Sequence, residues 1–235
     1  LGHMVGLIEK GFELPEASNT PVLFQVRVRS CHMTGSFVCK DNRRPDYSLS
    51  DAMNNPRRDL NRIVLPPAAY EHEAEKVKVR MPAAVRFVET HKLNEVFGPT
   101  GADKTGRTGL IVQGGMYNST IRALQFLGLS DAYGTSKLPI YVMNVTYPTI
   151  PSEVEAFCAG LDTVLIVEEG QPEYLEQSIS TVLARSKSAT VVRGKDYLPM
   201  GGDYTAAVLT DGIGRFLADH EPQMLGNRAP VPVPV

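Results

Sequence analysis

Two adjacent glutamates stand at the end of an apolar run. Residues Thr163–Val167 read Thr-Val-Leu-Ile-Val, and Glu168, Glu169 and Gly170 follow directly. A run of β-type apolar residues that stops in charge is typical of a buried parallel strand leaving the core at the carboxyl edge of a sheet. Ligands and partner domains meet at that edge in open α/β proteins. The pair could therefore act in acid–base catalysis, or it could position a neighbouring domain.

The geometry of an extended chain favours positioning. Adjacent side chains of a strand point to opposite sides, so Glu168 and Glu169 cannot readily form one acid–base pair. We expect one carboxylate to face the N-terminus of the next helix, and the other to contact a backbone amide or arginine at a domain or subunit interface. A solvated strand end, or a cap for the helix beginning near Pro172, is the alternative. If the pair acts at an interface, replacing both residues with Gln should leave the isolated domain folded, at a cost within about 1 kcal/mol, because surface changes usually cost little.

A glycine pair, Gly114-Gly115, lies between a predicted strand and a predicted helix. Backbone amides at such a turn, together with the helix N-terminus, can bind a phosphate or a carboxylate. The pair matches neither the GxGxxG pattern nor a phosphate-binding loop, because no Gly-Lys-Ser or Gly-Lys-Thr follows. The pair is therefore a possible anion-binding turn, with an ordinary tight turn as the alternative.

A third group lies near residue 30. Arg29 and His32 are at the end of a predicted strand, where polar residues often line a site, and we treat both as interface or positioning candidates. Cys31, His32 and Cys39 suggest zinc, but the chain has no CxxC pair and no second Cys/His pair, so no metal site is predicted. Without a Ser-His-Asp set, a GxSxG elbow or an HExxH motif, no catalytic residue is predicted either.

After residue 106 the sequence contains four strand–helix repeats, which must position the glycine pair and the glutamate pair. Such repeats predict an α/β fold with three layers, α/β/α, in which helices cover both faces of a mostly parallel sheet. We expect Ser152 to cap its helix, with Glu155 at the third helical position. The predicted strands cover residues 110–113, 140–145, 163–167 and 189–193, and the predicted helices cover 118–127, 153–159, 173–185 and 204–218.

The chain before residue 106 is less regular. A short helix over residues 5–17 should end at Pro15, and a charged helix over 71–92 should kink or break near Pro82. Residues 30–69 are polar and aperiodic, which indicates a crossing between domains.

A strand over residues 21–29 has no sheet of its own nearby in sequence. We expect it to pair with another copy of the chain or to be poorly ordered.

Composition limits the function further. The 235 residues carry 24 basic and 26 acidic side chains, a net charge of -2, so bulk electrostatics favour neither nucleic acid nor an anionic membrane. No apolar run approaches the roughly 18 residues of a transmembrane helix, and no secretory signal is visible. The three widely spaced cysteines indicate a reducing cytoplasm. The basic pairs at residues 43–44 and 57–58 are balanced by nearby aspartates, which indicates a solvated loop.

Two parts of the chain together resemble one family, the indolepyruvate ferredoxin oxidoreductases. Glu13-Leu14, Pro21-Val22-Leu23 and the stretch Arg27-Val28-Arg29-Ser30-Cys31-His32-Met33-Thr34-Gly35 are similar to the end of that family's pyrimidine-binding domain. A second set of residues resembles the family's next domain, which is related to the C-terminal domain of transketolase. These residues are Thr108-Gly109-Leu110-Ile111, Tyr117, Val164-Leu165-Ile166-Val167-Glu168-Glu169-Gly170, Glu173 and Glu176-Gln177.

The resemblance implies a parent enzyme that oxidatively decarboxylates arylpyruvates to acyl-CoA thioesters. Such enzymes use thiamine diphosphate, Mg²⁺, iron–sulfur clusters, CoA and ferredoxin. This chain has no diphosphate motif and no cysteine cluster, so we expect no cofactor in this segment. Its expected partners are the remaining domains of the parent and a second copy, with ferredoxin bound through the parent.

The resemblance also implies the domain order. Residues 5–60 correspond to the tail of the pyrimidine-binding domain and a linker, 61–105 to a connecting helix and loop, and 106–221 to the transketolase-like domain. Residues 1–4 look like a cloning remnant, and 222–235 like a proline-rich linker.

Three functions remain open. The chain is expected to be a non-catalytic structural and interface segment of an indolepyruvate ferredoxin oxidoreductase. It could instead be the matching domain of a 2-oxoacid dehydrogenase E1 β chain or of a deoxyxylulose phosphate synthase. The third alternative is an autonomous α/β module that binds a small anion at Gly114-Gly115.

Overall fold

The computed structural model describes residues 1–42, 44, 46–56, 62–101 and 106–226. The chain divides into two compact units, Leu1–Phe87 and Val88–Val235. The boundary falls inside one helix, and the domain boundaries expected from the sequence stay predictions. The basic pairs at 43–44 and 57–58 and the proline-rich tail lie wholly or partly outside the described residues.

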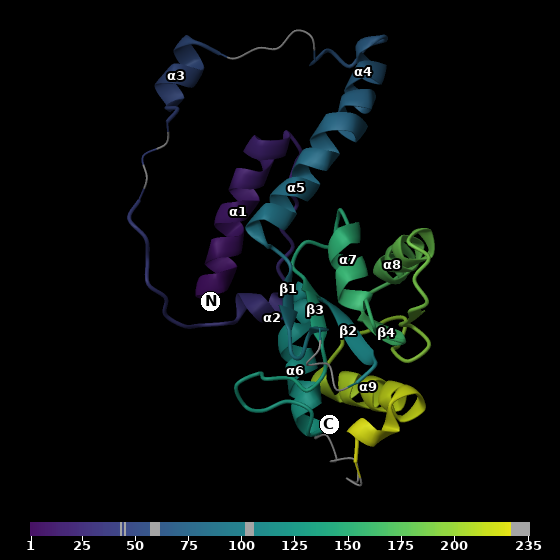
Figure 1. The fold of residues 1–235 in the computed structure, drawn as a ribbon. Coiled ribbons are helices and arrows are strands. Elements are labelled where there is room, and N and C mark those ends of the chain that lie inside the picture. The colour runs from purple at the N-terminus through teal and green to yellow at the C-terminus, as the bar shows by residue number, and fades with distance from the viewer. Residues whose placement is uncertain (43, 45, 57–61, 102–105, 227–235) are drawn as a thin grey trace. The chain divides into compact units, whose positions relative to one another are not determined.

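The second unit is built on a five-stranded sheet with the order β1-β3-β2-β4-β5 (Figure 1). β1 pairs antiparallel with β3, and the other neighbours pair in parallel. The predicted mostly parallel sheet is therefore confirmed. Its strands are β1 (Glu95–Phe97), β2 (Thr108–Gln113), β3 (Ile140–Met143), β4 (Thr163–Val167) and β5 (Val191–Arg193).

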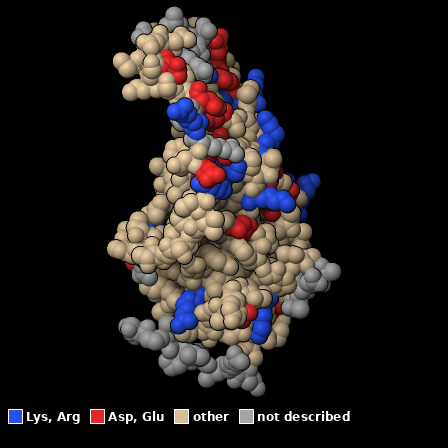
Figure 2. Space-filling view, turned by 90° about the vertical axis from the view of Figure 1, so that its left-hand side faces the viewer, with Lys and Arg blue, Asp and Glu red and all other residues tan. Residues whose placement is uncertain are grey.

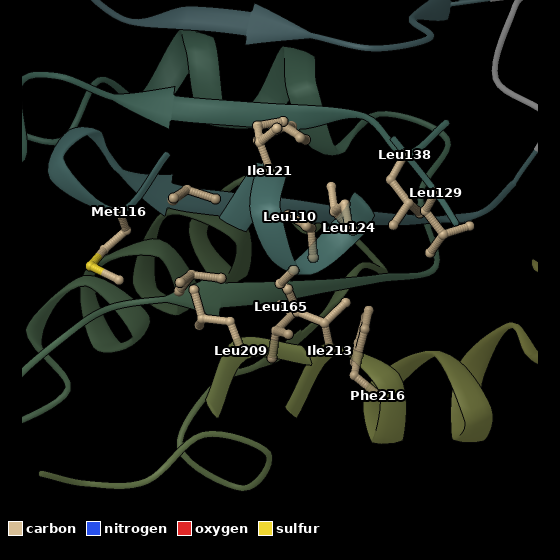
Figure 3. Close-up of a cluster of buried hydrophobic side chains, with 14 of the residues drawn as sticks. Leu110, Met116, Ile121, Leu124, Leu129, Leu138, Leu165, Leu209, Ile213 and Phe216 are labelled. Atoms are coloured by element: carbon tan, nitrogen blue, oxygen red, sulfur yellow. The ribbon is translucent and has the colours of Figure 1, made fainter. Parts of the chain in front are cut away.

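Helices cover both faces of this sheet. α6 (Tyr117–Phe126) and α9 (Ala206–His220) contribute to one apolar core, and α7 (Pro151–Cys158) and α8 (Tyr174–Arg185) contribute to the other. Figure 3 shows the first core, in which side chains of β2 and β4 meet those of α6 and α9. The predicted three-layer α/β/α architecture is confirmed.

The central strands explain why the apolar runs are continuous rather than alternating. Successive residues of a strand face opposite sides, so a strand covered on both faces is apolar throughout. Leu165 belongs to the first core and Ile166 to the second, and all five residues of β4 are buried. β2 follows the same rule with Leu110 and Ile111.

Two local features of this unit differ from the prediction. Strand β1 was not predicted, since it is only three residues long and lies at the edge of the sheet. The next residue must be glycine: Gly98 has φ 81, and a Cβ there would lie 2.2 Å from the backbone oxygen of Leu138. The predicted Ser152 cap is wrong. Ile150 is the N-cap of α7 and Pro151 its first residue, a position that suits proline, while the Ser152 hydroxyl donates to Glu89.

A long helical run precedes the sheet. α4 (Ala68–Glu75) continues into a π-helical stretch, η2 (Lys76–Arg80), and then into α5 (Met81–His91). Pro82 has no N–H to donate, so the regular hydrogen-bond pattern cannot continue through it. The helix is not broken at Pro82, which lies inside α5; the irregularity near it is the π-helical stretch η2, which ends at Arg80.

The first unit corrects two predictions. α1 (Gly2–Ser18) runs through Pro15. Its C-cap is Asn19, whose left-handed backbone (φ 54) lets its N–H donate to the Pro15 carbonyl. The predicted strand over residues 21–29 is wrong. Residues 21–27 have no regular secondary structure, because a strand needs a neighbour for its backbone hydrogen bonds and the described part of this unit contains no other strand. The unit's remaining short helices are α2 (Val28–Cys31) and α3 (Leu49–Asn54).

Among the described residues, no helix combines the length and the apolar character that a membrane crossing requires.

Candidate functional site

The carboxyl ends of β2 and β4 meet at a reversal in the winding of the sheet. These strands are parallel neighbours, yet α6 after β2 and α8 after β4 pack on opposite faces. Ligands and partners of open α/β sheets bind where the winding reverses. Of the predicted site residues, Gly114 and Gly115 follow β2, and Glu168 and Glu169 follow β4, so the structure brings these four to one edge.

Glu168 caps the helix that follows it. Its carboxylate is buried, with only 5% of the residue exposed, and accepts from the Leu175 amide at 3.0 Å to each oxygen and from the Glu176 amide at 3.3 Å. The N-cap residue Glu173 makes no side-chain cap of its own. Glu168 therefore satisfies the free amides of α8 from the end of the preceding strand, where the helix dipole favours negative charge. The expectation that one carboxylate faces this N-terminus is confirmed.

Glu169 binds a different part of the same chain. Its Oε1 accepts from the backbone amide of Tyr204 at 2.7 Å, and its own amide donates to the side-chain oxygen of Gln113 at 2.9 Å. One residue thus joins the end of β2, the end of β4 and the segment before α9. The expected backbone-amide partner exists, but it belongs to this chain; the interface role of Glu169 stays a prediction.

Lys195, which the sequence analysis did not single out, holds the backbone of the same loop. Its Nζ donates to the carbonyl oxygens of Glu168 at 2.6 Å and Gly170 at 2.7 Å, and to the Tyr204 hydroxyl at 2.8 Å. Its backbone amide donates to Glu176 Oε2 at 3.1 Å. Partial burial lowers the pKa of Lys195, while four surrounding glutamates act in the opposite direction.

Tyr204 completes this network, which we name the edge network and define as Glu168, Glu169, Glu176, Lys195 and Tyr204. The buried Tyr204 hydroxyl accepts from Lys195 and donates to the Pro199 carbonyl. Burial, and then the charges of the three glutamates, raise the pKa of Tyr204 to about 12. The hydroxyl therefore keeps its proton at neutral pH and can make both contacts.

Two glycines allow polar side chains to approach the backbone at this edge. A Cβ on Gly194 would lie 2.1 Å from Glu176 Oε2, and one on Gly114 would lie 2.6 Å from Asn144 Oδ1. Gly114 therefore has a packing reason to be glycine, which agrees with the tight-turn alternative. Anion binding by Gly114 and Gly115 stays a prediction.

A second polar cluster lies beside β3 and also went unnoticed in the sequence. The buried Tyr141 hydroxyl donates to Glu153 Oε2 at 2.6 Å, and Asn94 Nδ2 donates to the same carboxylate at 2.8 Å. Asn144 Nδ2 donates to Glu95 Oε2 at 2.8 Å. Burial, followed by the nearby Glu153, raises the pKa of Tyr141. These contacts connect β1, β3 and α7, and we interpret this cluster as structural.

The other predicted candidates belong to the first unit. Arg29 lies in α2, and its side chain is outside the described part of the structure; His32 directly follows this helix and is exposed. Cys31 and Cys39 are exposed, whereas Cys158 is buried in the second core. Within the described residues, no group of three or more His, Cys, Asp or Glu side chains is placed to hold a metal ion.

Comparison with known proteins finds related subunits. The indolepyruvate oxidoreductase subunit IorA of Methanothermobacter thermautotrophicus is 31% identical over 214 residues, which covers 90% of this chain and 32% of that protein. The IorA subunit of Methanothermobacter marburgensis is 30% identical over 184 residues (78% of this chain, 27% of the relative), and that of Pyrococcus horikoshii is 23% identical over 223 residues (92% and 32%). The chain thus spans about a third of the length of these relatives. No protein-family model matches it.

Among solved structures, a 2-oxoglutarate:ferredoxin oxidoreductase from Magnetococcus marinus aligns with a TM-score of 0.41 and 18% identity, over 63% of this chain and 23% of that one. A split-gene transketolase aligns with a TM-score of 0.37 and 18% identity, over 53% and 41%.

Proposed function

We propose that this chain, which belongs with the IorA subunits of indolepyruvate oxidoreductases, is a non-catalytic structural and interface segment of such an enzyme. Its α/β unit would present the carboxyl edge of the sheet to the rest of the protein. The relationship predicted from the sequence is confirmed by the relatives, and the role within the enzyme is our proposal.

The edge network supports a structural role. A general acid or base must reach a proton of the substrate. Glu168 is buried and accepts three hydrogen bonds from two amides of α8, and Lys195 donates to two carbonyls and a hydroxyl. The groups at this edge that could do proton chemistry are therefore engaged in holding loops.

Exposed apolar side chains at the same edge support the interface. Tyr147 follows β3 and is 80% exposed, Tyr174 begins α8 and is 67% exposed, and Met200 follows β5 and is 46% exposed. Loops that follow parallel strands lie at one edge, so the three side chains share it with the edge network. Tyrosine and methionine are enriched in protein interfaces, so the partner we propose is another protein surface rather than a small ligand.

The catalytic cofactors would then belong to other parts of the parent enzyme. We propose that the parent, located in the cytoplasm, decarboxylates arylpyruvates oxidatively to acyl-CoA with thiamine diphosphate, Mg²⁺, iron–sulfur clusters and CoA, and passes electrons to ferredoxin. The dispersed cysteines and the lack of a metal-binding group in the described residues support this assignment. A second copy and the remaining domains would be the partners.

Calorimetric titration of the purified chain with thiamine diphosphate and Mg²⁺ tests the cofactor assignment. We expect no heat of binding, whereas an intact subunit of the same enzyme family should bind under the same conditions. Micromolar binding by the chain alone would show that it holds the cofactor itself, and would overturn the non-catalytic proposal.

Substitution at the carboxyl edge tests the interface. Tyr147→Ser with Tyr174→Ser in the parent enzyme should reduce assembly and turnover, while the stability of the isolated chain changes by less than about 0.5 kcal/mol, as is usual for surface positions. Tyr133→Ser is the matched control, because Tyr133 is 95% exposed on the loop before β3, at the opposite edge. Wild-type assembly and turnover in the double variant would exclude this interface.

A further inference from the structure

Two exposed tyrosines lie beside one seam of the carboxyl edge. The hydroxyls of Thr149 and Ser178 are hydrogen-bonded at 2.8 Å, which joins the loop before α7 to the first turns of α8. Tyr147 lies two residues before Thr149, and Tyr174 lies one helical turn before Ser178. The two helices cover the same face of the sheet (Figure 1). We name Tyr147, Glu173 and Tyr174 the edge corner.

Both rings of the edge corner are open to solvent. Tyr147 is 80% exposed and Tyr174 is 67% exposed. The face of an aromatic ring carries partial negative charge, so an exposed tyrosine attracts a cation as well as apolar surface. The chemistry of the neighbouring charges therefore decides which kind of surface fits here.

The loops around the corner are acidic. Residues 144–150, 168–173 and 194–205, which follow β3, β4 and β5, contain five carboxylates and one ammonium group. One of the carboxylates, Asp196, pairs with Arg193 of β5. The whole chain is nearly balanced, with 26 acidic and 24 basic side chains, and the face in Figure 2 carries both signs. The excess of negative charge is thus a local property. The six charged residues of these loops are Glu168, Glu169, Glu173, Lys195, Asp196 and Asp203.

The one ammonium group in these loops is already engaged. Lys195 Nζ donates to two backbone carbonyls and to the Tyr204 hydroxyl. In the part of the chain that the structure describes, Glu173 forms no ion pair, and its carboxylate accepts from Gln177 Nε2 at 3.2 Å. Hydrogen bonds with its own backbone and with Gln177 hold the pKa of Glu173 below its usual value. The corner therefore presents an ionised carboxylate directly beside an exposed ring.

We propose that the edge corner binds a surface of the parent enzyme that presents arginine. This inference rests on the interface proposed for the carboxyl edge and names the chemistry of its partner. A guanidinium group stacks on an aromatic face and pairs with a carboxylate through two parallel hydrogen bonds. Tyrosine and arginine are also enriched among the residues that contribute most to protein interfaces.

Other partner surfaces fit the corner less well. An acidic surface would be repelled by the carboxylates of the three loops. A purely apolar surface would cover the Glu173 carboxylate without giving it a partner, which is costly for a charged group. An ammonium group is more strongly hydrated than a guanidinium group and has no planar face to stack.

Opposite charges at one position test the sign of the partner. Gln171 is exposed two residues before Glu173. In the parent enzyme, Gln171→Lys should lower assembly and turnover at least about fivefold, because it repels a cationic surface, whereas Gln171→Glu should keep or strengthen assembly. Glu155→Lys is the control, since Glu155 is exposed on α7 one helical turn further from the carboxyl edge, and it should change both by less than about twofold.

Ring substitutions test the aromatic contribution. Tyr147→Phe with Tyr174→Phe keeps both ring faces and should retain turnover within about twofold, whereas Tyr147→Leu with Tyr174→Leu keeps apolar area without a ring and should lower it at least about fivefold. Sedimentation velocity measures assembly, which should weaken as KCl is added. Arginine amide should inhibit assembly at a lower concentration than lysine amide at equal ionic strength.

The outcomes separate this inference from the interface on which it rests. If Tyr147→Ser with Tyr174→Ser has no effect, the interface itself is wrong. If that variant impairs assembly but the leucine pair behaves as wild type, the partner is apolar. If Gln171→Lys has no effect or strengthens assembly, the partner is not cationic. Phenylalanine variants as impaired as the serine variants would assign the contact to the hydroxyls, and stronger inhibition by lysine amide would exclude arginine. Each of these results overturns the proposal while the interface stands, provided that circular dichroism shows the variants to be folded.

Discussion

The ammonium nitrogen of Lys195 lies 2.6 Å from the backbone carbonyl oxygen of Glu168, while the carboxylate of the same glutamate binds the amides that begin α8. Glu168 is therefore held at both its backbone and its side chain. Through Glu168, the end of β4 is connected to the segment after β5, which contains Lys195, and to the N-terminus of α8. The shape of the carboxyl edge depends on these contacts.

Lys195→Met should destabilise the second unit. Met keeps most of the apolar stem but cannot donate, so the carbonyls of Glu168 and Gly170 and the hydroxyl of Tyr204 lose a donor. An unsatisfied buried polar group costs about 1–3 kcal/mol. Urea unfolding should show a loss in that range, and hydrogen exchange should show faster exchange for the amides of the β4–α8 loop.

Lys187→Met is the control for this change, because Lys187 is exposed at the end of α8. It should alter the free energy of unfolding by less than about 0.5 kcal/mol. Equal small effects for the two lysines would mean that Lys195 contributes nothing that solvent cannot replace.

Glu168→Gln should cost more than Glu169→Gln. The Glu168 carboxylate is buried and accepts from two amides at the α8 N-terminus, so its loss should cost about 1.5–3 kcal/mol, the range for hydrogen bonds to charged groups. Glu169 is partly exposed and its contact with the Tyr204 amide should cost about 0.5–1.5 kcal/mol. Chemical denaturation at neutral pH measures both.

This expectation replaces the smaller cost predicted from the sequence, which assumed that both glutamates were at the surface. Glu155→Gln on the exposed side of α7 provides the baseline for losing one negative charge. If Glu168→Gln matched that baseline, capping of α8 by this side chain would contribute nothing to stability.

Glu221→Gln should weaken the opposite edge of the sheet. Glu221 is only 4% exposed, and its carboxylate accepts from the Thr108 amide at 3.1 Å, the Thr108 hydroxyl at 2.6 Å and the Arg107 amide at 3.2 Å. A neutral amide places a donor among donors, which should cost about 1–3 kcal/mol. Thermal unfolding should show a lower Tm for this variant than for Glu155→Gln, and an equal Tm would contradict the role of Glu221 as an anchor between α9 and β2.

The sequence predicts the central strands well because burial is the cause of their pattern. β4 coincides with the predicted strand, Thr163–Val167, since a strand covered on both faces must be apolar throughout. The position of Glu168 and Glu169 follows from the same reasoning, because the first charge marks the end of the buried run. α8 begins within one residue of its predicted start, at Tyr174.

The wrong prediction of a strand at residues 21–29, and the contacts and the strand that were not predicted, share another cause. Each depends on a structural partner that is distant in sequence. Residues 21–29 have β-type side chains, but a strand forms only against another strand. Lys195 is 27 residues from Glu168 and belongs to no motif, so only the fold brings the two together. Glu221 is likewise 113 residues from Thr108. Strand β1 is too short to show a periodicity and exists through its pairing with β3.

Alkaline pH should release the edge network, and Tyr204→Phe should make the chain less sensitive to it. The pKa of the Tyr204 hydroxyl is raised to about 12 by burial and nearby glutamates, whereas an unfolded tyrosine titrates near pH 10. A raised pKa in the folded state contributes stability that is complete below pH 10 and is lost as the pH rises towards 12. The lowered pKa of Lys195 has the opposite sign. As the pH rises, the folded state loses this proton before the unfolded state does, so the contribution of Lys195 to stability increases with pH until the unfolded lysine titrates near about pH 10.4. The net decline should therefore begin near pH 10 and steepen above it.

Urea midpoints measured across this window should fall less steeply in Tyr204→Phe than in the wild type, although the variant starts from a lower stability because the Pro199 carbonyl and Lys195 lose a partner. Tyr133→Phe, at an exposed hydroxyl, should keep the wild-type slope. Parallel curves for the wild type and Tyr204→Phe would show that the Tyr204 hydroxyl does not couple folding to alkaline pH.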